Sequence, residues 1–213
     1  MLDKPLLERI PKKSEDLDVK PTKAQYLALF AIAFTLFTNS LTISYLYPFT
    51  GIMAYQFGKV DSTTGSGSYA SLINMSFFVG RSTSVAQWGK FSDLKGRKMT
   101  IMICLICVFV VMFFFSFVQS YWICVIGRFI LGVVSGLSPI CKAALTEVLP
   151  KNRNAEAVGY ASAVWYLGNF AGPFIGGNTL FLLDSYFILP SLMSCFTVFA
   201  SWYLILTLFS ETI

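Results

Sequence analysis

Long apolar blocks, separated by short polar connections, run through most of the sequence. A helix needs roughly 20 mostly apolar residues to cross a bilayer, so blocks of this length predict membrane spans. The composition agrees, because 55% of the residues are hydrophobic and 13% are charged, whereas soluble domains carry about 25% charged residues. The alternation typical of membrane β-strands does not recur. Because lipid cannot satisfy backbone polar groups, we predict an all-α membrane protein.

Six transmembrane helices are predicted, and they divide the chain into three parts. Residues 1–25 form a polar, cytoplasmic tail that we expect to be disordered, residues 26–210 form the helical domain, and residues 211–213 begin a cytoplasmic loop. The predicted spans are Tyr26–Tyr55, Tyr69–Trp88, Met99–Val118, Tyr121–Val148, Ala155–Leu183 and Tyr186–Phe209.

Basic residues predict the orientation of the spans. Cations gather in the tail and in the second and fourth connections, whereas the first, third and fifth connections carry only Lys59. Cytoplasmic loops are enriched in Lys and Arg, so both termini are predicted to be cytoplasmic. A nucleic-acid partner is not expected, because the cations cluster at the ends of apolar blocks. The stretch DKPLL, residues 3–7, resembles an acidic dileucine sorting signal, so the predicted location is a vacuolar, lysosomal or plasma membrane.

Enzymatic and metal chemistry find little support in the sequence. Cys104 and Cys107 have CxxC spacing, but a second such pair and any histidine are missing, so we expect neither a metal site nor a cofactor. We also find no nucleophile–base set and no nucleotide-binding loop. An enzyme is therefore not predicted.

The connection GKFSDLKGRK, residues 89–98, concentrates charge between two apolar blocks. Asp93 is expected at the cytoplasmic end of the second span, and Gly96 permits a tight reversal because it tolerates positive φ. Arg97 and Lys98 then begin the third span. An acid and a guanidinium so placed can bridge neighbouring helix ends in one conformation and separate in another.

Two more stretches and one separate arginine, Arg81, are unusual within the predicted spans. Arg128, in GRFILGVVSG, is a cation inside a predicted membrane helix, which is costly and therefore suggests function; the alternative is that it reaches the outer interface near Tyr121. Arg81, within the second span, either faces a water-filled cavity or reaches the inner headgroups. In GNFAGPFIGG, residues 168–177, glycines recur at helical spacing and Pro173 favours a bend; the alternative is an ordinary close-packing helix.

These stretches together resemble the major facilitator superfamily. The connection fits the family's pattern G-x-L/F-x-D-x-x-G-R-K/R, and the other two fit its fourth-helix and fifth-helix motifs. The resemblance implies an N-terminal six-helix half, built from two inverted three-helix repeats. It further implies a gating loop, a proton-coupling arginine and an antiporter motif that shapes contact with the other half. The residues implied are Gly89, Asp93, Gly96, Arg97 and Lys98 for gating, Arg128 for proton coupling, and Gly168, Gly172, Pro173, Gly176 and Gly177 for the antiporter motif.

Three segments narrow the resemblance to the zinc-induced-facilitator-like branch, near the drug/proton antiporters and tetracycline exporters. They are TISYLYPFTGIM, residues 42–53, the WGKFSD loop, and SPICKAALTEV, residues 138–148. The branch implies a proton-coupled antiporter that exports a small organic solute or metal chelate by alternating access, with a second six-helix half or chain as partner. The alternative is a non-transporting half-transporter or scaffold subunit. Substrate-binding candidates are Asn39, Tyr45, Lys142 and Glu147, and Glu147 is also a candidate member of the gate network.

Overall fold

The computed structural model of the protein describes residues 22–59, 65–149, 153–182 and 188–209. The dileucine-like stretch 3–7 and the predicted loop 211–213 lie outside these residues, as does most of the predicted tail. The described residues form eight helices: α1 (Lys23–Ser44), α2 (Thr50–Gln56), α3 (Gly67–Lys95), α4 (Arg97–Phe115), α5 (Tyr121–Val134), α6 (Leu137–Val148), α7 (Asn154–Leu182) and α8 (Ile188–Leu208).

These helices make six long segments, because the predicted first and fourth spans are each divided in two. α1 and α2 make up the first segment, and α5 and α6 make up the fourth. Each interruption falls four residues before a proline: α1 ends at Ser44, before Pro48, and the break at Ser135 precedes Pro139. A proline cannot donate to the carbonyl four residues back, and its ring clashes with that carbonyl, so the helix stops there.

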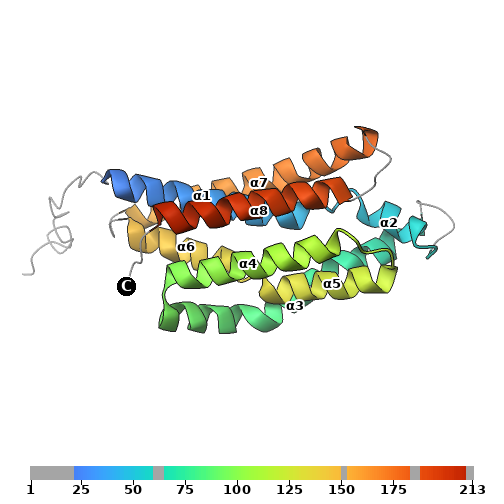
Figure 1. Ribbon diagram of the computed structural model, residues 1–213, viewed down its shortest axis with the longest axis horizontal. Coiled ribbons are helices and arrows are strands. Elements are labelled where there is room, and N and C mark those ends of the chain that lie inside the picture. The colour runs from blue at the N-terminus through green and yellow to red at the C-terminus, as the bar shows by residue number, and fades with distance from the viewer. Residues whose placement is uncertain (1–21, 60–64, 150–152, 183–187, 210–213) are drawn as a thin grey trace, which may run out of the picture.

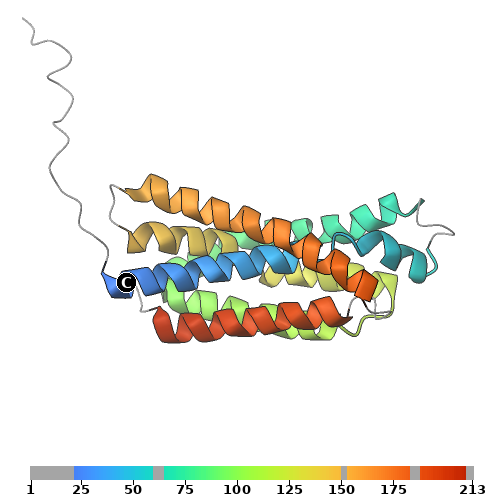
Figure 2. The same cartoon turned by 90° about the horizontal axis from the view of Figure 1, so that it is seen from above.

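The segments run along the long axis of the molecule, and both described ends of the chain lie at one end of it (Figure 1). We call this end, where α1 begins and α8 ends, the terminal end. α1 is central: it packs against α6, α7 and α8, while α3 packs most closely against α5, and α4 against α8. Figure 2 shows α1 between α7 and α8. The two halves of the unit repeat this arrangement. The first segment (α1) packs against the fifth (α7), and correspondingly the fourth segment (α5) packs against the second (α3), as inverted three-helix repeats require.

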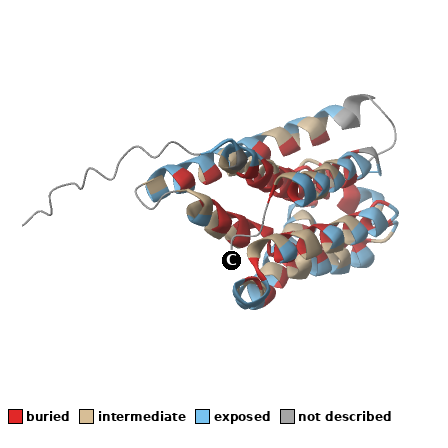
Figure 3. Ribbon diagram, turned by 60° about the vertical axis from the view of Figure 1, so that its left-hand side comes forward, coloured by how far each residue is buried: buried red, intermediate tan, exposed pale blue. Residues whose placement is uncertain are grey.

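Burial is inverted relative to a soluble protein. Phe170 and Phe196 are 75% and 73% exposed, and exposed residues cover much of the outer faces of the helices (Figure 3). α1, by contrast, buries a series of hydroxyl and amide side chains, each at most 4% exposed: Thr35, Thr38, Asn39, Ser40, Thr42 and Ser44. Exposed aromatic surface of this extent is suited to lipid or to another membrane-embedded unit.

The six segments differ in hydropathy. Within the described residues, Gln25–Ser44, Arg97–Phe115, Tyr121–Val148 and Pro190–Leu208 are long and apolar enough to cross a membrane by themselves. α3 and α7 are longer, at 29 residues each, but neither is apolar enough by this criterion, and α3 is the more polar of the two. A polar membrane helix is stable where it faces protein or a water-filled cavity rather than lipid.

The connection between α3 and α4 is shorter than the sequence suggested. α3 continues to Lys95, well beyond the predicted end at Trp88, and Gly96 alone separates it from α4. Gly96 has φ 92° and ψ 153°, a conformation that is essentially confined to glycine. The stretch 89–98 is therefore mostly helical rather than a loop, and its charges are held on rigid elements.

Candidate functional site

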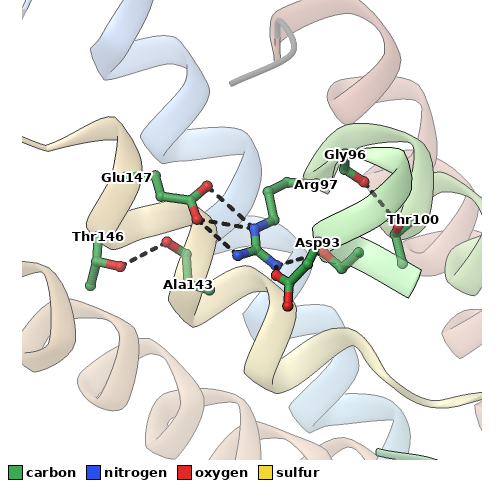
Figure 4. Close-up of polar contacts among 8 residues, drawn as sticks. Asp93, Gly96, Arg97, Thr100, Ala143, Thr146 and Glu147 are labelled. Carbon is green, nitrogen blue, oxygen red and sulfur yellow. Dashed lines mark hydrogen bonds and ion pairs between the residues drawn. The ribbon is translucent and has the colours of Figure 1, made fainter. Parts of the chain in front are cut away.

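Arg97 joins three helices at the terminal end of the bundle. Its Nη1 lies 2.8 Å from Asp93 Oδ1, and its Nη2 lies 2.9 Å from Glu147 Oε1. Its Nε donates to Glu147 Oε1 at 3.1 Å, and Nη1 donates to Ser92 Oγ at 2.8 Å. Figure 4 shows the guanidinium between the two carboxylates. We call Asp93, Arg97 and Glu147 the charge network.

The positions of these charges explain why a guanidinium is needed. Asp93 is in the last turn of α3, and Glu147 is in the last turn of α6. Negative charge is unfavourable at helix C-termini, where carbonyl groups lack partners. Arg97, the first residue of α4, offsets both charges at once. The side chains are 18% exposed for Arg97, 65% for Asp93 and 39% for Glu147, so water screens the contacts and the network can separate at modest energetic cost.

The remaining gating-loop residues have unequal roles in this structure. Lys98 Nζ donates to Leu206 O at 3.1 Å and so caps the end of α8. Gly96 forms the turn. A Cβ at Gly89 would meet no described atom within 4 Å, so this glycine is not required for close packing in this structure.

Arg128 is enclosed in the bundle. It is 1% exposed, so it does not extend to an outer interface. Its Nη2 donates at 3.2 Å to Ile43 O, in the last turn of α1, and its Cζ lies 5.7 Å from the centre of the Phe77 ring. Arg128 thus caps one carbonyl in the last turn of α1, where carbonyls lack helical partners. Its Nε and Nη1 have no hydrogen-bond partner among the described residues.

The glycines of the fifth-span motif pack within this unit. A Cβ at Gly168 would lie 2.6 Å from Phe37 O, one at Gly172 would collide with Ser44 Oγ, and one at Gly176 would collide with Tyr45 O. The resemblance implied that this motif shapes contact with the other half, but in this structure α1 and the residues directly after it cover the stripe. α7 remains helical on both sides of Pro173, and a Cβ at Gly177 would meet nothing within 4 Å.

Two of the four substrate-binding candidates are occupied by contacts inside the unit. Asn39 is 3% exposed, and its Oδ1 accepts a hydrogen bond of 3.1 Å from Ser135 Oγ. Tyr45 is 1% exposed, and its hydroxyl lies 3.0 Å from Ser191 Oγ. In this conformation both side chains tie helices together rather than line an open surface.

Lys142 and Glu147 belong to α6 but do not form one site with Asn39 and Tyr45. Lys142 is partly exposed on α6, whereas Glu147 is held in the charge network at the terminal end. The four candidates are therefore dispersed, and the structure does not bring them together as a single pocket.

Two residues that the sequence analysis did not single out contribute to this arrangement. Ser92 binds Arg97, and its position next to Asp93 at the end of a helix was an available signal. Trp88 donates through Nε1 to Val133 O at 2.8 Å and packs against Gly136. It thereby satisfies a carbonyl freed by the break between α5 and α6. The sequence does not reveal this contact, because Trp88 lies 45 residues before Val133 and two spans earlier.

The apolar exposed faces, the buried polar helix α1 and the charged terminal end define a multi-span helical integral membrane protein. The chain belongs to the Major Facilitator Superfamily, whose family model matches residues 32–211. This result confirms the family and half-fold predicted from the sequence motifs. The superfamily consists of membrane transporters rather than enzymes.

Known proteins also support the predicted branch. ZINC INDUCED FACILITATOR 1 of Arabidopsis thaliana is 31% identical over 161 residues, which is 76% of this chain and 33% of that protein. Multidrug resistance protein MdtG of Rahnella sp. (strain Y9602) is 27% identical, over 76% of this chain and 38% of its own length. The chain thus spans about a third of the length of the curated relatives it matches.

A solved structure agrees with the fold. The crystal structure of the human organic anion transporter MFSD10 (TETRAN) matches with a TM-score of 0.70 and 16% sequence identity, covering 89% of this chain and 48% of that one. The match to about half of a larger chain is what a six-segment half of a two-half transporter produces.

Proposed function

We propose that the protein is a secondary active transporter, or one half of it, that works by alternating access. The observation that carries this proposal is the charge network. One guanidinium, Arg97, holds the ends of α3, α4 and α6 together through partly exposed contacts of 2.8 and 2.9 Å. Such contacts are strong enough to favour one state and weak enough to be exchanged for another.

The orientation proposed for the protein follows from charge. The terminal end carries Arg97, Lys98 and other cations, and basic connections favour the cytoplasmic side. The charge network then closes the cytoplasmic end and stabilises an outward-facing state. We propose a vacuolar, lysosomal or plasma membrane as its location.

We propose that the protein exports a small organic solute or a metal chelate, and that export is coupled to protons. The names of relatives support it, since they include a multidrug resistance protein and a zinc-induced facilitator. Arg128, a buried cation with two unpaired donors, is the proposed link to proton coupling. The span sites Asn39 and Tyr45 would reach the solute only in another conformation.

A second six-segment unit, from the same polypeptide or from another chain, is the proposed partner. The relatives are about three times as long as the stretch they share with this chain. Solute would bind between the two units, as in transporters built from repeated halves.

Flux measurements with the native protein in proteoliposomes test the proposal. Under an imposed pH gradient, we expect saturable flux of at least one member of a panel of labelled organic acids, amines and zinc chelates. Asp93→Asn removes one charge of the network, so we expect roughly tenfold lower turnover, the effect of about 1.4 kcal/mol on the barrier or balance of states.

Lys90→Gln is the matched control, because Lys90 is an exposed cation of α3 outside the charge network. It should leave flux unchanged. Unaltered flux in Asp93→Asn would refute the gate. No flux for any solute, with the protein correctly inserted, would favour the scaffold alternative.

A further inference from the structure

Arg81 is a cation at the centre of a membrane helix. It is the middle residue of α3, equally far from Gly67 and Lys95, which places it about 20 Å from either helix end. The predicted span within α3 ends at Trp88, seven residues beyond Arg81, and the rest of α3 carries charged residues of the terminal end, so Arg81 lies inside the span on its terminal-end side. Ionisable residues at such positions face a bundle interior or a water-filled cavity and mark solute pathways.

The guanidinium of Arg81 differs from the other two arginines described above. Arg97 is paired with two carboxylates and Arg128 donates to a carbonyl, whereas Arg81 has neither an ion pair nor a side-chain hydrogen bond within the described parts of the chain. Its contact is with the ring of Trp165, whose centre lies 5.6 Å from Arg81 Cζ. A cation–ring contact is not a hydrogen bond, so it leaves N–H donors of the guanidinium available to an acceptor.

Both partners are fixed by rigid elements. Trp165, on α7, has its carbonyl held by Ser40 Oγ at 2.6 Å, and Asn169 Nδ2 donates to the same hydroxyl at 2.7 Å. On α3, Gly80 lies against Phe129 O, which seats α3 directly on α5 one residue before Arg81. A binding group held this way keeps its geometry without the help of a loop.

Polar residues flank Arg81 on the same helix. Ser82, Thr83 and Gln87 are exposed on α3, and α3 does not reach the hydropathy of the four apolar segments. The hydroxyls of Ser82 and Thr83 donate to carbonyls of their own helix, Val79 O and Gly80 O. The unpaired guanidinium of Arg81 is therefore the group on this part of α3 that an anionic ligand would engage.

We propose that Arg81 and Trp165 form a subsite within the membrane for an anionic group of the transported solute. A carboxylate would pair with two N–H donors of the Arg81 guanidinium, beside the Trp165 ring. The solute class is then a small organic acid, in which a negative charge is carried next to an apolar or aromatic body. This inference rests on the proposed transport function and specifies its substrate.

Binding of two matched probes to the purified native protein tests the subsite. 2-Naphthoate and 2-naphthamide share one ring system and differ in charge, and isothermal titration calorimetry measures both without any turnover. We expect 2-naphthoate to bind at least about tenfold more tightly than the amide, as a charge-assisted bidentate pair provides.

Variants assign that preference to the proposed residues. Arg81→Gln should abolish the preference for the acid, and Arg81→Lys, which keeps the charge but not the planar fork, should retain part of it. Trp165→Leu should weaken binding of both probes. Lys90→Gln should bind as the native protein does, and thermal unfolding identifies any variant that is not folded.

The inference is overturned if the native protein binds the acid no better than the amide, or if the preference survives in folded Arg81→Gln. Because calorimetry needs no transport, these outcomes are separate from a failure of the flux measurements. An Arg81-dependent preference in a protein without flux would retain the subsite and reject the transporter.

Discussion

Gly96 shows how much one residue decides at the terminal end. Its φ of 92° and ψ of 153° turn the chain from α3 into α4 within a single residue, and this turn brings Arg97 beside Asp93. The charge network depends on that turn, since a longer connection would leave the two charges unpaired or variably placed. The backbone conformation of Gly96 thus positions the ion pair between Arg97 and Asp93.

Replacing this glycine makes a prediction at the residue scale. Gly96→Ala should lower the free energy of unfolding by about 1–3 kcal/mol, because an L residue is strained at this φ and ψ. Gly89→Ala is the matched control in the same motif: it lies inside α3 with open space around it, and alanine favours helix. Thermal unfolding in detergent compares the two. Equal stability of both variants would contradict the strain argument.

Arg128 is the second case at this scale. Arg128→Met keeps much of the volume and removes two buried donors without partners, but it also leaves Ile43 O without its hydrogen bond. We therefore expect insertion to persist with a loss of stability of at most about 1–3 kcal/mol. We expect the pH response of flux to weaken, because the buried cation near Tyr45, Tyr47 and Cys124 is gone. Flux at a series of pH values in proteoliposomes measures this. A full pH response in the variant would show that Arg128 serves only to cap α1.

What the sequence could predict at this scale depends on distance along the chain. Asp93 and Arg97 are four residues apart, so their pairing followed from local geometry, whereas Glu147 is 50 residues further on and entered only through resemblance. The bond between Asn39 and Ser135 spans 96 residues and could not be predicted, because it depends on how two helices pack. Asn39 was read as free for a solute for that reason.

At the scale of elements, glycines set how closely helices approach. Gly168, Gly172 and Gly176 let the backbone of α7 lie against α1, and Gly80 and Gly132 do the same for α3 and α5. Spacing in the sequence predicted the smooth stripe correctly but not its partner. The four-residue spacing of the glycines identifies one face of a helix, but only the packed structure shows which other helix covers that face.

A matched pair of alanine substitutions tests this contact. Gly172→Ala would place a Cβ 2.9 Å from Tyr45 N and against Ser44 Oγ, so we expect a loss of about 1–3 kcal/mol of stability from overpacking. Gly177→Ala, about one turn along the same helix, meets open space and should be neutral or slightly stabilising. Thermal unfolding is again the measurement, and a neutral Gly172→Ala would indicate that α1 and α7 are not in close contact in the membrane.

The divided spans were readable from the sequence but were not predicted. Pro48 lies four residues beyond the end of α1 and Pro139 four residues beyond the break at Ser135, and the rule that a proline removes that hydrogen bond was sufficient to place both breaks. We did not predict the breaks, because the first and fourth spans are apolar throughout and therefore looked like continuous helices. Pro173 shows the limit of the rule, since α7 continues through it.

At the scale of the whole molecule, the large exposed aromatic surface must be covered by lipid and by a partner unit. We predict that the native polypeptide is about twice 23.7 kDa, because the superfamily builds its transporters from two six-helix halves. Intact-mass measurement of the protein purified from its natural source decides this. A mass of 23.7 kDa would instead require a second chain as partner, and cross-linking would then identify it.

The close seating of α7 on α1 has a mechanical consequence. Only the short side chains of Ser40 and Ser44 lie between the two backbones at Gly168 and Gly172, and both hydroxyls bond to carbonyls of α7, so little flexible material is present to absorb a shift of one helix against the other. A displacement applied to either helix is transmitted to the other without slack. We therefore expect α1 and α7 to move together as one rigid unit. Opening at the terminal end would tilt both helices together and would not bend either of them.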